Sequence, residues 1–450
     1  MSPLPPVCFF ITSLASRLVA PMPQPSANTG FFRTLCWAVY LGCSWTWCIG
    51  MFLPVILVSE FGNFAWFVFA IPNVIGAAAM GWTLAKPGAS EQIVAEHRTA
   101  CVAFSAVTMV FQIFFLLWLS SKNLIPGSFA IAAFGGGIVL GLLSRGVKRT
   151  DFLLAWIVWG ISLAVFARGM QHPVFGVSQS LNLVPRGSAF SGLTAVCLFG
   201  FLLCPYLDLT FHRARQNTAP TAGKAAFGIG FGLVFLLMIV LTMLYAGDFA
   251  LDQTLNDRFG SFGGALLITW VAFHISSQIG FTLAAHVQAM PVPKPREWVV
   301  LVVAVLLLVG SVIALRQQVW SGLPLNRGNL ASDGAPVWIV VERYFAQVRF
   351  QMFTGDLVYR LFMSFYGLVF PAYVWICMVP LRGRSPGASP RAIGVFATAV
   401  AIAAPMFWLG FINERMLWLI PAVTLVLSAR VVVWIGTGRP ARASLRGERY

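Results

Sequence analysis

Long apolar stretches, separated by short polar connections, run along most of this chain from Phe32 to Gly436. A helix needs about 20 apolar residues to cross the hydrocarbon core of a bilayer, and in lipid its backbone groups must be satisfied within the segment. Short alternating segments, which would indicate transmembrane strands, do not occur. The pattern therefore predicts an all-α integral membrane protein with about twelve transmembrane helices: Phe32–Val58, Phe64–Ala85, Thr99–Ser120, Ser128–Ser144, Asp151–Ala167, Phe190–Phe211, Ala225–Ala246, Phe262–His286, Trp298–Leu315, Thr354–Pro380, Ala392–Ile412 and Met416–Gly436.

The composition agrees with a membrane protein, because 58% of the residues are hydrophobic and only 10% are charged. Soluble domains carry about 25% charged residues. The net charge of +16 would also suit a nucleic-acid-binding protein, but Lys and Arg gather in the cytoplasmic loops of membrane proteins. With a cytoplasmic N-terminus, 20 of the 30 Lys and Arg residues fall in cytoplasmic segments. We therefore predict cytoplasmic N- and C-termini, a location in the plasma (inner) membrane, the lipid bilayer as partner and no nucleic-acid partner.

The twelve segments divide into two sets of five and a final pair. We predict a cytoplasmic tail (1–31), a first five-helix repeat (32–171), a second five-helix repeat (188–380), two trailing helices (390–437) and a basic cytoplasmic tail (438–450). Because each repeat holds an odd number of helices, the second repeat is inverted relative to the first. Inverted repeats of this kind are typical of secondary transporters.

Several kinds of chemistry find no support in the sequence. The chain has no GxxxxGK(S/T) phosphate-binding loop, no CxxC pair and no group of Cys and His with metal-ligand spacing. Its eight cysteines lie almost entirely in apolar segments, which is typical of small buried side chains. The sequence thus argues against an ATP-driven pump and a dedicated metal site. We predict that the protein is not an enzyme and that it needs no cofactor beyond a coupling ion.

Helix-breaking residues occur in the first and the sixth segments, which occupy matching positions in the two repeats. The first segment contains Cys48-Ile49-Gly50-Met51-Phe52-Leu53-Pro54, and the sixth contains Gly200-Phe201-Leu202-Leu203-Cys204-Pro205. Matching broken helices indicate a binding site near the middle of the membrane, although Gly and Pro are also common in membrane helices generally. The residues that we expect to bind a small-molecule solute are Trp45, Cys48, Gly200, Cys204 and Pro205.

The eighth segment carries Ser276 and Ser277 side by side in an apolar helix, next to Gln278. Hard cations prefer oxygen ligands, so the two hydroxyl groups could bind a cation. The alternative is that each serine hydrogen-bonds to its own helix or to a neighbouring helix. The residue pattern alone leaves both interpretations open.

The paired hydroxyl residues of the eighth helix, the broken first and sixth helices and the five-plus-five arrangement together resemble the leucine-transporter-type fold of the amino acid–polyamine–organocation superfamily. The resemblance is to its sodium:solute symporters and nucleobase:cation symporters. It implies that Na⁺, or alternatively H⁺, is the coupling ion. The Na⁺ site would be formed by Ser276 and Ser277 through Oγ and by backbone carbonyls at Phe273, Trp47 and Gly50.

A second, shorter stretch also resembles the nucleobase:cation symporters. The sixth segment ends Pro205-Tyr206-Leu207-Asp208-Leu209-Thr210-Phe211-His212-Arg213, which is similar to their Asp-x-Ser-Arg stretch. In this chain Thr replaces Ser, and two further residues separate it from the arginine. The resemblance would imply a nucleobase as substrate.

Few charged residues lie within the apolar segments. Asp208 is the acid that the segments enclose, and a charge inside a membrane costs at least about 2.5–3.5 kcal/mol, so it is functional by default. It could carry a proton, help to hold a cation, or form an inner gate with Arg213 or His212. At the start of the tenth segment, Asp356 and Arg360 are four residues apart, which suits a local ion pair or an outer gate.

These patterns favour a secondary active transporter that couples the symport of a small organic solute to a cation by alternating access. One alternative is a membrane-embedded transferase acting on a lipid-linked substrate, with Asp248, Asp252 and Asp257 as the available acids. Another is a sensor or subunit that has the same fold but does not transport. The sequence indicates neither the substrate nor the oligomeric state.

Overall fold

The computed structural model describes residues 30–46, 48–121, 124–145, 147–170, 190–249, 262–317, 354–380, 387–413 and 415–436. Within these ranges the chain is helical apart from short turns, and it contains no strand. Trp47, Asp252 and Asp257 lie outside the described residues, as does Val337–Phe353, for which the sequence suggests an amphipathic helix. The prediction of an all-α protein is confirmed.

The helices follow the apolar segments of the sequence closely. In chain order they are α2 (Phe31–Trp45), α3 (Cys48–Phe61), α4 (Phe64–Thr83), α5 (Ala89–Glu96), α6 (Arg98–Ser121), α7 (Gly127–Leu143), α8 (Lys148–Met170), α9 (Phe190–Leu203), η1 (Cys204–Leu207), α10 (Leu209–Gln216), α11 (Pro220–Ile229), η2 (Gly230–Phe235), α12 (Leu236–Phe249), α14 (Phe262–Ala289), α15 (Pro295–Gln317), α17 (Thr354–Ser364), η3 (Phe365–Val369), α18 (Phe370–Tyr373), η4 (Val374–Met378), α19 (Pro390–Phe407), η5 (Trp408–Ile412), η6 (Met416–Trp418) and α20 (Leu419–Gly436).

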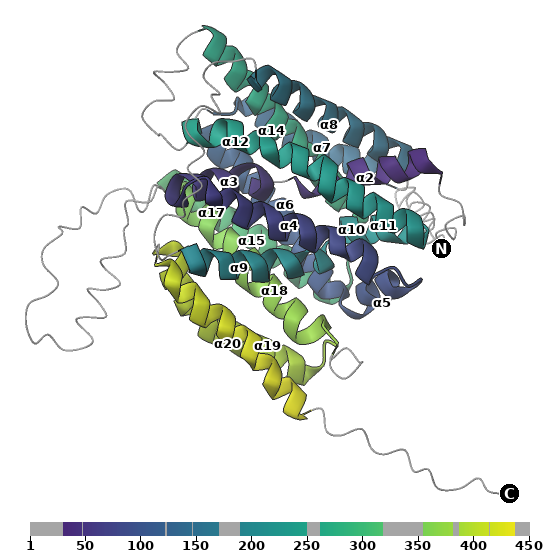
Figure 1. Ribbon diagram of the computed structural model, residues 1–450, viewed down its shortest axis with the longest axis vertical. Coiled ribbons are helices and arrows are strands. Elements are labelled where there is room, and N and C mark those ends of the chain that lie inside the picture. The colour runs from purple at the N-terminus through teal and green to yellow at the C-terminus, as the bar shows by residue number, and fades with distance from the viewer. Residues whose placement is uncertain are drawn as a thin grey trace, which may run out of the picture.

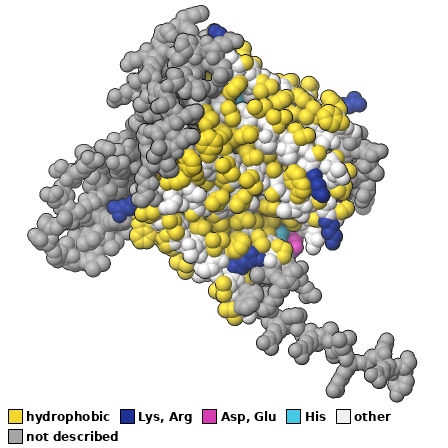
Figure 2. All heavy atoms as spheres, in the orientation of Figure 1, with side chains coloured by type: hydrophobic (Ala, Val, Ile, Leu, Met, Phe, Trp, Pro, Cys, Tyr) yellow, Lys and Arg dark blue, Asp and Glu magenta, His cyan; other side chains and the backbone are white. Residues whose placement is uncertain are grey.

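Nine helical stretches among the described residues are long and apolar enough to cross a membrane, and the bent pair α2–α3 makes a tenth. The two remaining predicted spans are helical as well: α7 has 17 residues and α14 has 28. The surface agrees with this class, because hydrophobic side chains cover much of the described part of the face in Figure 2 and few charged ones interrupt them. The chain is therefore an integral membrane protein in contact with the lipid bilayer.

Figure 1 shows the helices as one bundle, with α19 and α20 packed on each other at one edge of it. In the bundle α14 packs on α7, α15 on α6, and α4 on α9. The division into two inverted repeats of five helices stays a prediction.

Close packing between helices depends on glycine at particular crossings. A Cβ atom added at Gly76 of α4 would lie 2.1 Å from the carbonyl oxygen of Phe201 in α9, and one added at Gly137 of α7 would lie 2.6 Å from that of Gly280 in α14. Small residues allow membrane helices to approach closely without a hydrophobic driving force. Gly76 therefore brings α4 and its polar residue Asn73 against the broken sixth span.

Candidate functional site

The first predicted span is broken. Helix α2 ends at Trp45 and α3 begins at Cys48, and the axes of the two helices differ by 53°. The Thr46 side chain satisfies part of the exposed backbone, because its Oγ donates a hydrogen bond to Gly42 O at 2.8 Å. Further along α3, Pro54 has no N–H to donate to the carbonyl of Gly50, four residues earlier. The break and the proline thus both free backbone groups in this span.

The sixth predicted span is broken in a similar way. Helix α9 ends at Leu203, a short 3₁₀ turn runs from Cys204 to Leu207, and α10 begins at Leu209. Pro205 lies in this turn and cannot donate to the carbonyl of Phe201, again four residues earlier. Asp208 caps α10, since its Oδ1 accepts a hydrogen bond from the Thr210 N–H at 2.7 Å.

Residues of the two breaks line one small cavity. Its walls include Gly50 and Phe201, the residues whose carbonyls lose a helical donor to the prolines, and its water-accessible volume is about 10 Å³. A volume of this size holds about one water molecule. The lining consists of Trp45, Ile49, Gly50, Asn73, Phe201, Cys204 and Tyr366.

Side chains from other helices hold the two breaks in place. The Trp45 Nε1–H donates to Asn73 Oδ1 of α4, and the Tyr359 hydroxyl donates to the Cys48 carbonyl at 3.1 Å. The Cys204 thiol donates to the Tyr366 carbonyl at 3.1 Å. Each broken span is therefore bonded to the tenth span, through Tyr359 and Tyr366 respectively.

A direct bond also joins the two broken spans. The Thr210 Oγ of α10 donates to Ser44 Oγ of α2 at 3.2 Å, and Ser44 Oγ donates in turn to the Leu41 carbonyl at 3.1 Å. Both hydroxyl groups are fully buried. A buried bond between two polar side chains fixes the relative position of the segments that carry them.

The predicted substrate residues are distributed around this cavity. Trp45 and Cys204 line it. Cys48 offers its carbonyl to Tyr359, and Pro205 lies one residue beyond Cys204. Gly200 lines a neighbouring apolar cavity between α3, α9 and η3, where a Cβ atom would lie 2.7 Å from the carbonyl oxygen of Tyr366.

The predicted cation-site residues of α14 have other surroundings. Ser277 Oγ donates to the His274 carbonyl of its own helix at 2.9 Å, and the Phe273 side chain is 45% exposed. Ser276 Oγ is buried and has no hydrogen-bond partner among the described residues. It precedes Gly280 by four residues and therefore shares the helix face that packs on Ala133 of α7.

The polar contact from α14 to the first broken span is made instead by Gln278, whose Nε2–H donates to the Cys43 carbonyl. Phe281 adds a ring contact to Tyr40 of α2, with centroids 5.8 Å apart. Gly50 faces Phe235 and Ile239 of the seventh span. The sodium site at the serine pair stays a prediction, and the structure adds Gln278 as the side chain that reaches α2.

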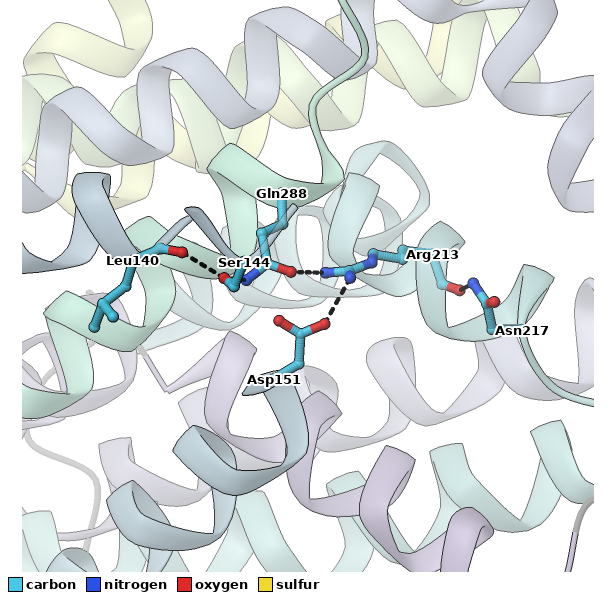
Figure 3. A network of polar contacts seen from close by, with 6 residues as sticks. All are labelled: Leu140, Ser144, Asp151, Arg213, Asn217 and Gln288. Carbon is cyan, nitrogen blue, oxygen red and sulfur yellow. Dashed lines mark hydrogen bonds and ion pairs between the residues drawn. The ribbon is translucent and has the colours of Figure 1, made fainter. Parts of the chain in front are cut away.

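The predicted gate between Asp208 and Arg213 is not what the structure shows. Arg213 Nη2 contacts Asp151 Oδ2 of α8 at 2.6 Å, and Nη1 donates to Gln288 Oε1 of α14 at 2.8 Å (Figure 3). Gln288 bonds in turn to Ser144 of α7. Asp208 is the N-cap of α10, and Arg213 lies five residues later, beyond the i,i+3 and i,i+4 spacings at which side chains on a helix meet.

The other gate partner considered for Asp208 is also engaged elsewhere. His212 Nδ1 lies 2.8 Å from Ser90 Oγ of α5, and His212 Nε2 lies 2.9 Å from the Tyr206 carbonyl oxygen. Arg360, predicted to pair with Asp356, is buried, and its Nη1 donates to the Phe411 carbonyl at 3.1 Å. The Asp356 side chain lies outside the described residues.

Ser44 and Asn73 are parts of the site that the sequence analysis did not single out, and Thr210 was noted only as the residue that replaces Ser in the Asp-x-Ser-Arg-like stretch. Asn73 carries the one amide side chain in the apolar span of α4, so a search for isolated polar residues would have found it. Ser44 and Thr210 are small hydroxyl residues of a kind common in membrane helices. Only their contact across the bundle distinguishes them.

No known family model matches the chain, and no curated protein matches its sequence. Among solved structures it is similar to the Eremococcus coleocola manganese transporter in complex with an aromatic bis-isothiourea substituted compound, at 14% identity and a TM-score of 0.44, covering 92% of this chain and 96% of that one. Two variants of the same transporter match at 13% identity and a TM-score of 0.42, covering 94% of this chain and 98% of theirs. A likeness of this degree shows no function for the chain.

Proposed function

We propose that this protein is a secondary active transporter, which couples the symport of a small organic solute to a cation by alternating access. The observation that carries the proposal is that the breaks of the first and sixth spans meet at one buried cavity. In a regular membrane helix the backbone N–H and C=O groups bond to one another, so none is left to bind a ligand. A broken helix exposes carbonyl and N–H groups within the membrane.

The cavity suggests what kind of solute group would bind. Its lining carries no charged side chain, and Pro54 and Pro205 leave the carbonyls of Gly50 and Phe201 without their usual helical donors. Two carbonyl acceptors beside the Trp45 and Tyr366 rings suit an N–H group or a small organic cation.

Contacts at both ends of the site support alternating access. Toward α5, Arg215 donates to the carbonyls of Leu84 and Ala85 at 2.7 and 2.8 Å. Toward the start of the tenth span, Tyr359 bonds to Cys48, and its ring lies 5.3 Å from that of Phe52. A cavity that admits about one water must enlarge to take an organic solute. In alternating access, one of these two sets of contacts would open for entry of the solute and the other for its release.

Uptake into proteoliposomes tests the proposal. Purified protein would first be screened for thermal stabilisation by amino acids, nucleobases, polyamines and sugars, and the best solutes would be tested for accumulation under Na⁺ or pH gradients. We expect Asn73→Leu to reduce uptake at least about tenfold, because it removes the partner of Trp45 at similar volume. The matched control is Ile71→Leu, on the exposed face of the same helix.

The predicted sodium site is tested in the same assay with Ser276→Ala and Ser277→Ala. Loss of the dependence on a Na⁺ gradient is the result expected if these hydroxyl groups hold Na⁺. Unchanged Na⁺-driven uptake would contradict that site but not the transport function. Absence of uptake and of exchange for every solute, with folded protein in the vesicles, would contradict the transport function itself.

A further inference from the structure

One buried acid close to the breaks has no counter-charge. Asp208 is fully buried, and its Oδ1 accepts a hydrogen bond from the Thr210 N–H at 2.7 Å and one from the Thr210 Oγ–H at 2.7 Å, whose single hydrogen is shared with Ser44 Oγ. Its Oδ2 is buried and has no hydrogen-bond partner among the described residues. The two oxygens of this carboxyl group therefore have different roles: Oδ1 caps α10, whereas Oδ2 has no structural partner.

The basic side chains nearest in sequence are held by other groups. His212 bonds to Ser90 and to the Tyr206 carbonyl, and Arg213 pairs with Asp151. Within the described part of the chain, no Lys, Arg or His nitrogen forms an ion pair with Asp208.

The titratable groups of the surrounding elements do not supply a positive charge either. The groups that interact electrostatically with Asp208 are Tyr40 of α2, Cys101 of α6 and Tyr366 of η3, and all three are neutral at neutral pH. From the three other elements that pack on α10, Glu91 of α5 is exposed, His286 of α14 bonds to Ser105, and the neutral Tyr206 of η1 bonds to Thr83.

An isolated carboxylate in a medium of low dielectric constant is costly, and a group in that position binds a proton or a cation instead. A hard metal ion needs several oxygen ligands, whereas among the described residues Asp208 belongs to no group of three or more His, Cys, Asp or Glu side chains that could hold one. A proton needs only Oδ2 itself.

We propose that Asp208 is the proton-binding site of this transporter and that its Oδ2 takes up and releases the coupling proton. This inference rests on the proposed function, since a coupling proton has meaning only in a transporter. The Thr210–Ser44 bond links the carboxyl group to the first broken span. A change in the charge of Asp208 would therefore alter the contact between the two spans whose breaks form the cavity.

The substitution Asp208→Asn separates the two roles of the carboxyl group. Asparagine is as good a helix cap as aspartate, so the fold should be retained, but the side chain cannot bind or release a proton at neutral pH. The matched control is Glu297→Gln, because Glu297 is also an acid of low exposure but forms an ion pair with Arg98 at 2.7 Å.

Infrared difference spectroscopy of the purified protein between pH 5 and pH 9 tests the site without any solute. We expect a carboxylic acid C=O band at neutral pH in the wild type and in Glu297→Gln, and its absence in Asp208→Asn. Identical spectra for the wild type and Asp208→Asn would show that Asp208 neither takes up nor releases a proton between pH 5 and pH 9, and would overturn the proposal.

A second measurement keeps the test valid if the band is hidden by others. A proton held only by the folded protein makes the unfolding temperature fall as pH rises. This fall should be present in the wild type and absent in Asp208→Asn, and equal slopes for the two proteins would overturn the proposal.

Transport then tests the coupling itself. A pH difference of one unit should drive up to about tenfold accumulation of a transported solute in the wild type, because one pH unit equals 1.36 kcal/mol. Asp208→Asn should give no accumulation while exchange across the membrane persists. A carboxylic acid C=O band from Asp208 without transport of any solute would overturn the transport function. Accumulation driven by a pH difference in Asp208→Asn would overturn only the role of Asp208.

Discussion

Two buried aspartates, Asp151 and Asp208, lie in the same bundle but in opposite electrostatic situations. Asp151 is 1% exposed and has Arg213 as a partner at 2.6 Å, whereas Asp208 is 0% exposed and has no basic partner among the described residues. Arg213 is five residues from Asp208 in the chain and 62 residues from Asp151. Which carboxylate pairs with Arg213 therefore depends on where the side chains lie in the bundle and not on their distance along the chain. A buried acid without a basic partner is favoured in its neutral form, and this applies to Asp208.

The largest effect on stability should follow from removal of Asp151, the aspartate that is paired with Arg213. Asp151→Ala leaves the partly buried guanidinium of Arg213 without its carboxylate, which should cost up to about 3–5 kcal/mol of the free energy of unfolding. Thermal unfolding of the purified protein measures it. The double variant Asp151→Leu with Arg213→Met removes both charges and should recover most of the loss; a single variant as stable as the wild type would contradict the ion pair.

Substitution of Asp208, the unpaired aspartate, should change the free energy of unfolding less, and the size of the change should depend on the residue that replaces it. Asp208→Ala removes the cap of α10 and should be about 1 kcal/mol less stable than Asp208→Asn, which keeps an acceptor for the Thr210 N–H. Unfolding curves of the two variants provide the test. A loss as large as that of Asp151→Ala would show that Asp208 has a charged partner after all.

A third titratable group should give a pH dependence opposite in sign to that proposed for Asp208. Burial lowers the pKa of His97, which lies between α5 and α6 with its Nδ1 3.1 Å from the Tyr373 hydroxyl, below the usual value of 6.5. Its neutral form is favoured in the folded state, so this contribution is present above about pH 6.5 and is lost as pH falls. The unfolding temperature between pH 8 and pH 5 should fall less in His97→Gln than in the wild type.

The smallest effect is expected at the paired serines. Ser277 Oγ bonds only to its own helix at His274, so Ser277→Ala should change the free energy of unfolding by less than about 0.5 kcal/mol. The same unfolding assay measures it, with addition of Na⁺ as a second condition. Stabilisation of the wild type by Na⁺ that Ser277→Ala lacks would support the sodium site predicted at this position.

Much of the architecture could be predicted from the residues alone. Long apolar segments fixed the positions of the helices, because a membrane span must be apolar and must satisfy its own backbone. Pro205 marked the break of the sixth span, since proline lacks an N–H wherever it is placed. The break of the first span lies before Cys48, whereas Gly50 and Pro54 lie within the continuous helix α3. Trp45 and Cys204 were therefore expected near the site, and both line the cavity.

The partners of the polar side chains could not be predicted in this way. Whether Arg213 meets Asp208 or Asp151, and whether Ser276 or Gln278 points toward α2, depends on how each helix is rotated in the bundle. That rotation is set by close contacts such as Gly76 against Phe201 and Gly137 against Gly280, which involve residues far apart in the chain. The sequence by itself determined that this is a helical membrane protein with two broken spans; only the tertiary structure decided which buried charges are paired and left Asp208 without a partner.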